Sequence, residues 1–118
     1  MRDINESDWK HLRELHPVAL ERFCERILVE VTNINADRTR RFHQRYFDIH
    51  ELLHRRDKEL AETFDDLKRS RALEMIAAMT RRGLLTDFEI MRFGQETRTF
   101  VGAILGKAIG LTASSAAR

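Results

Sequence analysis

The chain has 118 residues, of which 42% are apolar and 34% are charged, and its 21 basic and 19 acidic side chains give a formal net charge of +2. This length suffices for one domain that buries a core without metal ions, and the one cysteine excludes an intrachain disulfide framework. Charges of both signs are interspersed, which indicates solvated helix faces and disfavours nucleic acid as a partner.

The first residues are acidic where a secretory signal would be basic and then apolar, so we expect a cytoplasmic protein. Between Pro17 and Gly83 lie 65 consecutive residues without proline or glycine, and apolar side chains recur through them at helical spacing. This pattern predicts an all-α helical bundle. Residues 1–111 are expected to form a single domain, and the small polar residues 112–118 are expected to fray.

The first helix is expected to open near Ser7 and Asp8, because serine and aspartate are favoured N-cap residues. A break or kink is predicted at His16–Pro17, because proline is disfavoured beyond the first turn of a helix. A second helix is expected to begin there. Cys24 falls on its apolar stripe, which we interpret as a buried core thiol.

Residues 33–37 form the one predicted turn inside the breaker-free stretch, with Asp37 capping the next helix. One very long central helix is then predicted over about residues 38–82, and its length would be about 65 Å. A domain of this size has a radius of gyration of only about 13–14 Å. Unless it bends or breaks, such a helix would overhang its own domain, which predicts packing on a second chain as a homodimer.

The apolar stripe of this predicted helix changes phase along its length. The residues of its first part fall within about 60° of one another on a helical wheel. The stripe after Ser70 is centred about 100° away. Two alternatives remain open, since either the second part faces a different neighbour or the helix is interrupted near Lys68–Arg71. The first part comprises Phe42, Tyr46, Ile49, Leu53, Leu60, Phe64 and Leu67, and the second Ala72, Met75, Ile76 and Met79.

Capping signals divide the C-terminal third. Gly83 follows two arginines and is placed to end the long helix. Thr86 and Glu89 have the spacing of a capping box, which opens a short helix over about residues 87–93. A C-terminal helix is predicted over about residues 95–110.

A row of histidines beside the apolar stripe is the first candidate site. His50 and His54 have the i,i+4 spacing with which two imidazoles on one helix face reach one metal ion. Glu51 and His54 make one Glu-x-x-His pair, which ferritin-like bundles use twice. A second pair is absent from the sequence, so partly exposed histidines are the alternative interpretation. The candidate metal ligands are His43, His50, Glu51, His54 and Asp57.

Arg56 and Asp57 form a charged pair at the edge of the predicted buried face. A buried charge needs a partner, because an isolated one costs several kcal/mol. We interpret the pair as part of an interhelical or intersubunit Arg–carboxylate contact that fixes register. An anion-binding or acid–base site in a helical groove is the alternative.

Four arginines near the start of the long helix are possible anion contacts, namely Arg38, Arg40, Arg41 and Arg45. The positive end of the helix dipole does not favour cations there, so helix stability alone does not explain the cluster. No nucleic-acid-binding motif accompanies it.

Three glycines near the C-terminus are spaced four apart, at Gly102, Gly106 and Gly110. Small residues at this spacing let two helices approach closely, so we expect a packed helix or a dimer contact. The segment is shorter than the roughly 20 residues that a membrane span needs, which disfavours a membrane partner.

The sequence therefore favours a non-enzymatic helical module for protein interaction or regulation, which forms a homodimer and binds a protein partner of unknown identity. No motif identifies an enzyme class, and no cofactor is implied. Two alternatives remain, a metal-binding ferritin-like bundle and a weak nucleic-acid-binding protein.

Overall fold

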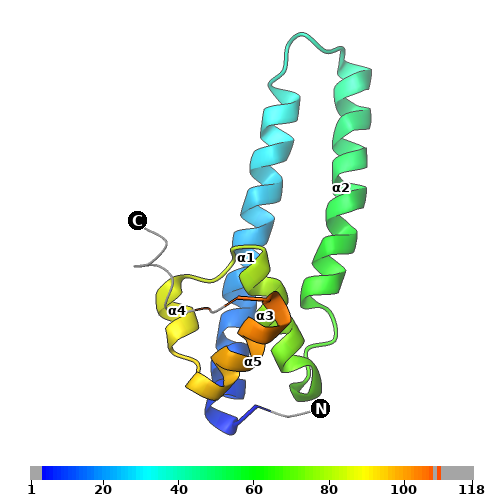
Figure 1. The fold of residues 1–118 in the computed structure, drawn as a ribbon. Helices are drawn as coiled ribbons and strands as arrows, with labels where there is room; N and C mark the ends of the chain where they lie inside the picture. Colours follow the sequence, from blue (N-terminus) through cyan, green and yellow to red (C-terminus); the bar gives the residue numbers. More distant parts are fainter. Residues whose placement is uncertain (1–3, 108, 110–118) are drawn as a thin grey trace, which may run out of the picture. The chain divides into compact units, whose positions relative to one another are not determined.

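A computed structural model describes residues 4–107 and 109. All regular structure in these residues is helical, which confirms the all-α prediction (Figure 1). The chain divides into two compact units, of which unit 1 is made of the described parts of Met1–Ala19 and Asp66–Arg118, and unit 2 of Leu20–Asp65. The elements in order are α1 (Glu6–Asn35), α2 (Phe42–Phe64), the 3-10 helix η1 (Arg69–Arg71), α3 (Ala72–Arg81), α4 (Asp87–Met91) and α5 (Gln95–Leu105).

α1 begins at an asparagine cap. The Asn5 side-chain oxygen accepts a hydrogen bond from the backbone N–H of Asp8 at 2.7 Å, which satisfies one of the free donors at the helix start. The predicted N-cap at Ser7 and Asp8 is therefore wrong, because the cap is Asn5, less than one turn earlier in the sequence. The Asp8 side chain is free to serve another contact because Asn5 does the capping.

The predicted break at His16–Pro17 is also wrong, since α1 runs for 30 residues with Pro17 inside it. Proline cannot donate to the carbonyl four residues earlier, which belongs to Arg13. Both Pro17 and Arg13 are exposed, so water can bind the carbonyl that loses its partner. Apolar residues on either side keep one buried stripe, which holds the helix together across the proline.

Unit 1 is built around the start of α1 and the helices α3, α4 and α5 (Figure 1). The predicted second stripe lies wholly in its core, because Ala72, Met75, Ile76 and Met79 are all buried. α3 packs on α5, where Val101 is fully buried. Burial of a large apolar side chain contributes about 1.5–3 kcal/mol, so this cluster stabilises the unit.

A buried carboxylate ties the start of α1 to the start of α5. Asp8 is 3% exposed, and its two oxygens accept the backbone N–H of Gly94 at 3.0 and 3.2 Å. One of them also accepts the Thr97 hydroxyl at 2.5 Å. Gly94 is the N-cap of α5, where a negative charge is favoured by the helix dipole. Asp8 therefore replaces the side-chain cap that a glycine cannot provide.

His11 makes a second long-range polar contact in unit 1. Its Nε2 lies 2.9 Å from the carbonyl oxygen of Glu89 and donates to it, while the ring packs on Phe93 at a centroid distance of 4.5 Å. The Nδ1 atom is buried without a hydrogen-bond partner among the described residues. This arrangement fixes α4 against α1 with one nitrogen of the ring.

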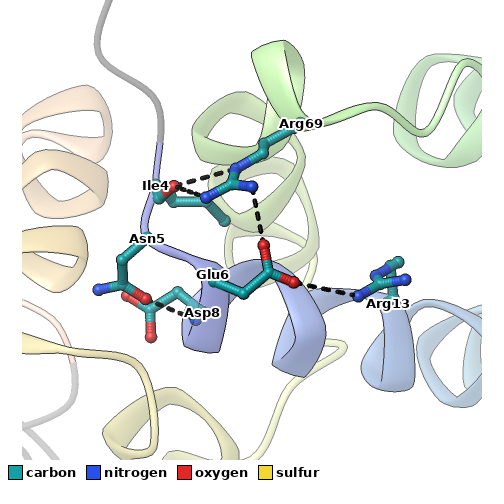
Figure 2. A network of polar contacts seen from close by, with 6 residues as sticks. All are labelled: Ile4, Asn5, Glu6, Asp8, Arg13 and Arg69. Atoms are coloured by element: carbon teal, nitrogen blue, oxygen red, sulfur yellow. Dashed lines mark hydrogen bonds and ion pairs between the residues drawn. The ribbon is translucent and has the colours of Figure 1, made fainter.

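Arg69 fastens the segment before α3 to the N-terminus of α1. Figure 2 shows its guanidinium reaching both the carbonyl oxygen of Ile4, at 2.9 and 3.2 Å, and the carboxylate of Glu6, at 2.9 Å. Glu6 in turn faces Arg13 at 3.8 Å. The Arg69 guanidinium therefore has two roles. It donates hydrogen bonds to a backbone carbonyl, and it neutralises an acidic residue in the first turn of α1.

Unit 2 is an antiparallel helical hairpin made of the second part of α1 and α2 (Figure 1). Phe23 and Ile27 are buried on α1, and Leu52 and Phe64 on α2, with the rings of Phe23 and Phe64 6.0 Å apart. Cys24 is half-buried on this hairpin, so its prediction as a core thiol is wrong. It lies at the margin of the stripe that α1 buries.

The loop of the hairpin confirms the predicted turn to within a few residues, since α1 ends at Asn35 and α2 starts at Phe42. Asp37 does not cap α2, however. Its carboxylate accepts the backbone N–H and the hydroxyl of Thr39, so it closes the loop itself, and Arg41 occupies the N-cap position without a side-chain bond.

The very long helix over residues 38–82 is wrong, and the interruption considered near Lys68–Arg71 is present. α2 ends at Phe64, Asp66 adopts a left-handed φ of 62°, and Lys68 is extended. Aspartate is among the few residues other than glycine that visit this region readily. Only Leu67 is apolar between Asp65 and Arg71, so no buried stripe holds the segment helical.

The helix caps predicted at Gly83 and at Thr86–Glu89 are both present. Gly83 has a φ of 69°, and Thr86 and Glu89 form the predicted capping box. α4 ends at Met91, two residues earlier than predicted, and α5 ends at Leu105 because Gly106 takes a left-handed φ of 78°. The predicted helix to residue 110 is therefore too long.

The predicted fraying of residues 112–118 lies outside the described residues, and the single domain over 1–111 stays a prediction.

We predict that Asp8→Ala destabilises unit 1 by about 1–3 kcal/mol, because it leaves the half-buried backbone N–H of Gly94 and the buried hydroxyl of Thr97 without an acceptor. The measurement is urea unfolding followed by the fluorescence of Trp9, the only tryptophan. Glu14→Ala, an exposed change on the same helix, is the control and should have little effect. Equal stability of the two variants would contradict the role given to Asp8.

Candidate functional site

All five candidate metal ligands lie on the exposed surface of α2. His43, His50, Glu51, His54 and Asp57 are each exposed. No three His, Cys, Asp or Glu side chains among the described residues come together as a metal site of three or more ligands would require. On the unbroken α2 helix His50 and His54 lie one turn apart, as do Glu51 and His54, and Asp57 follows His54 by about one turn.

Arg56 makes the interhelical carboxylate contact that its position suggested. Its guanidinium donates to both carboxylate oxygens of Glu30 on α1, at 2.8 and 2.9 Å, and to Glu59 at 3.1 and 3.2 Å. Asp57, the predicted partner, is exposed and does not take part in this contact. The two-pronged contact with Glu30 fixes the register of the hairpin, because a bidentate pair has one favourable geometry.

The same contact shifts the pKa of both side chains. The hydrogen bonds from Arg56 lower the pKa of Glu30 below its ordinary value of 4.5, against a smaller opposing effect of burial. The Glu30 carboxylate raises the pKa of Arg56 in turn. Both groups are therefore charged at neutral pH, and Arg56 is occupied within the chain rather than available to an external anion.

The four arginines near the hairpin loop have different roles. Arg45 is 8% exposed and donates to the carbonyl oxygens of Asn35 at 2.7 Å and Arg40 at 3.1 Å. Arg40 pairs with Asp48 at 2.8 Å. Arg38 and Arg41 are exposed. Two of the predicted anion contacts thus hold the hairpin loop in shape, which weakens the case for a phosphate-binding cluster.

The exposed part of the predicted α2 stripe is the most unusual surface of unit 2. Phe42 is 83% exposed, Tyr46 72% and Leu53 40%, with Ile49 half-buried between them. We call these four residues the α2 seam. The stripe was predicted to be buried, yet only its far end, at Phe64, is fully buried. The sequence therefore predicted correctly which residues of α2 form an apolar stripe, but the prediction that this stripe is buried is wrong for most of its length.

The seam is exposed because α2 buries a neighbouring face. Leu52, Arg56 and Thr63 lie toward α1, whereas the seam is centred about 70° further round the helix. A groove of about 660 Å³ opens beside the seam. It is lined by Val31, Thr32, Asn35, Ala36, Arg38, Phe42 and Arg45.

α1 extends this apolar surface. Leu28 is 64% exposed and falls within about 60° of the groove-lining residues Val31 and Asn35 on the helical wheel. Leu28 and the α2 seam therefore border the same side of the hairpin. Sequence reasoning missed Leu28, because Leu28 falls on the same apolar stripe as Cys24, which the sequence predicts to be buried.

The glycine stripe near the C-terminus does not form one helix face. Gly102 is buried in α5, Gly106 ends that helix in a left-handed conformation, and Gly110 lies outside the described residues. A separate open pocket of about 400 Å³ runs along α5 between Gln95 and Ile109. Among the described residues, no helix combines the length and the hydrophobicity that crossing a bilayer requires.

The chain matches no protein-family model, and comparison with curated proteins and with solved structures gives no match either. Function is therefore inferred from the chemistry of the side chains.

We expect Glu30→Gln to lower the free energy of unfolding at neutral pH by about 0.5–1 kcal/mol, because both partners are partly exposed to solvent. A lowered folded-state pKa stabilises the folded chain above the ordinary carboxyl pKa, and this contribution is lost as pH falls through the lowered value. The difference between wild type and variant should thus shrink in acid.

The measurement is urea unfolding by circular dichroism at several pH values. Glu25→Gln, an exposed change on the same helix, serves as the control. A difference for Glu30→Gln that stays constant down to acid pH would show that the carboxylate charge is not the cause.

Proposed function

We propose that this chain is a non-enzymatic protein-interaction or regulatory module that forms a homodimer through the α2 seam. The observation that carries the proposal is the exposure of Phe42 and Tyr46, at 83% and 72%, on one line of a well-formed helix. Large contiguous apolar patches are rare on monomeric proteins and mark interaction surfaces.

The size of the patch supports a protein partner. Each aromatic side chain presents roughly 150–250 Å², and Leu28 and Leu53 add to the same side of the hairpin. A stable interface of ordinary size buries about 800 Å² on each partner. The apolar patch supplies part of such an interface and the adjoining groove extends it, whereas a small ligand would leave most of the patch exposed.

Two features favour a second copy as the partner. The seam residues Phe42, Tyr46, Ile49 and Leu53 follow one another at spacings of four, three and four, which is the heptad spacing of paired helices. α2 also carries nearly balanced charge, so two copies would not repel each other strongly. The basic residues are Arg45, Arg55, Arg56 and Lys58, and the acidic ones are Asp48, Glu51, Asp57, Glu59 and Glu62.

The rival functions have weaker support. A ferritin-like centre needs several converging carboxylates and histidines, and the described residues contain no such group. A nucleic-acid surface needs available cations, and Arg40 and Arg45 are engaged within the hairpin. The cytoplasmic location stays a prediction.

Light scattering on the eluting protein tests the dimer. The chain has a mass of 13.9 kDa, so the wild type should show about twice this value at tens of micromolar. We expect Phe42→Glu, and separately Tyr46→Glu, to weaken dimerisation by at least about 30-fold, because an interface hot spot contributes about 2 kcal/mol or more.

The matched control is Phe88→Glu, which changes an equally exposed aromatic residue of unit 1. It should leave the dimer intact, and circular dichroism should show that all three variants remain helical. A monomeric wild type, or equal dimerisation of the Phe42 and Phe88 variants, contradicts the proposal.

A further inference from the structure

We propose that His50 and His54 form a two-histidine chelate for a divalent transition-metal ion of the Zn²⁺, Cu²⁺ or Ni²⁺ class. Imidazole nitrogen is a preferred ligand of these ions. The site lies on the outer surface of α2 and does not depend on the proposed dimer.

The backbone places the two rings correctly for a chelate. α2 is continuous from Phe42 to Phe64, and both histidines lie more than two turns from either end of it. Residues four apart have Cβ atoms about 5–6 Å apart on one helix face. Two imidazoles at that separation can direct one nitrogen each toward an ion at about 2.0–2.1 Å.

Both rings are available to bind. His50 and His54 are exposed, and no hydrogen bond or ion pair engages either ring within the described part of the chain. They lie about 140–180° from the residues that α2 packs on α1, so neither helix of the hairpin covers them. Both rings are therefore accessible to an ion from solvent, and the continuous helix holds their backbone positions at a fixed separation.

The other histidines do not offer the same arrangement. His11 is buried and donates from Nε2 to the carbonyl oxygen of Glu89. His43 is exposed but lies about 10 Å along the helix axis from His50, which is too far to share one ion. Among the three histidines of α2, the chelate is thus specific to one pair, and His43 provides a control of the same residue type on the same helix.

The surroundings set the character of the site. Exposed charges of both signs flank the pair, since Glu51 and Asp57 lie three residues before and after His54 and Lys58 lies four residues after it. With two protein ligands, the remaining coordination positions are left to water. This makes a reversible, open site rather than a closed structural one.

The test is titration of the full-length, tag-free chain with Zn²⁺, followed by calorimetry and by the ring signals of the five histidines in NMR. We expect one ion per chain and joint movement of the His50 and His54 signals. His50→Ala and His54→Ala should each weaken binding by at least about tenfold, because the second ligand of a chelate acts at high effective concentration. Acidification should release the ion, since binding requires neutral imidazole.

His43→Ala should bind Zn²⁺ as the wild type does. The Phe42→Glu variant should also retain binding, which separates failure of this site from failure of the proposed dimer. Absence of saturable binding below about 1 mM Zn²⁺, or unchanged affinity in His50→Ala and His54→Ala, overturns the proposal.

Discussion

An amphipathic helix can pack on a neighbour with only part of its circumference, and α2 has more apolar surface than α1 covers. The side turned to α1 carries Leu52 and the Arg56–Glu30 pair, whose two-pronged geometry permits one register. Once that register is set, Phe42 and Tyr46 remain in water. The exposed seam is thus a consequence of how the hairpin closes, and the proposed dimer is a way of covering it.

Arg45 reinforces this constraint at the hairpin loop. By donating to the carbonyl oxygens of Asn35 and Arg40, it holds the end of α1 against the start of α2 while its guanidinium lies 4.6 Å from the Phe42 ring centre. A cation over an aromatic face restricts the ring and stabilises its position. Phe42, the most exposed large apolar side chain among the described residues, is therefore presented on an ordered support.

Local signals in the sequence predicted local structure well. The breaker-free run predicted helices, and Gly83 and the Thr86–Glu89 pair predicted caps. The phase change after Ser70 falls within a few residues of the boundary between the two units, which lies after Asp65. Contacts between distant residues could not be read in this way. Asp8 meets Gly94 across 86 positions, and no periodicity encodes such a pairing.

The errors have a common physical origin. Pro17 was expected to end a helix, yet the cost of the lost hydrogen bond is reduced where water can bind the freed carbonyl, and exposure is a tertiary property. The long helix was expected because Asp66 carries no strong breaking signal, although it adopts a left-handed conformation. With that helix divided, its length no longer argues for a dimer, and the argument rests on the α2 seam.

Tyr46 is the only tyrosine in the chain, so the covering of the seam can be followed at one residue. The decisive measurement is the rate of chemical nitration of Tyr46 over a range of protein concentrations. A dimer through the seam predicts that Tyr46 is protected at high concentration and becomes reactive on dilution. Full reactivity at every concentration would contradict the account, because the seam would then face water even where chains associate.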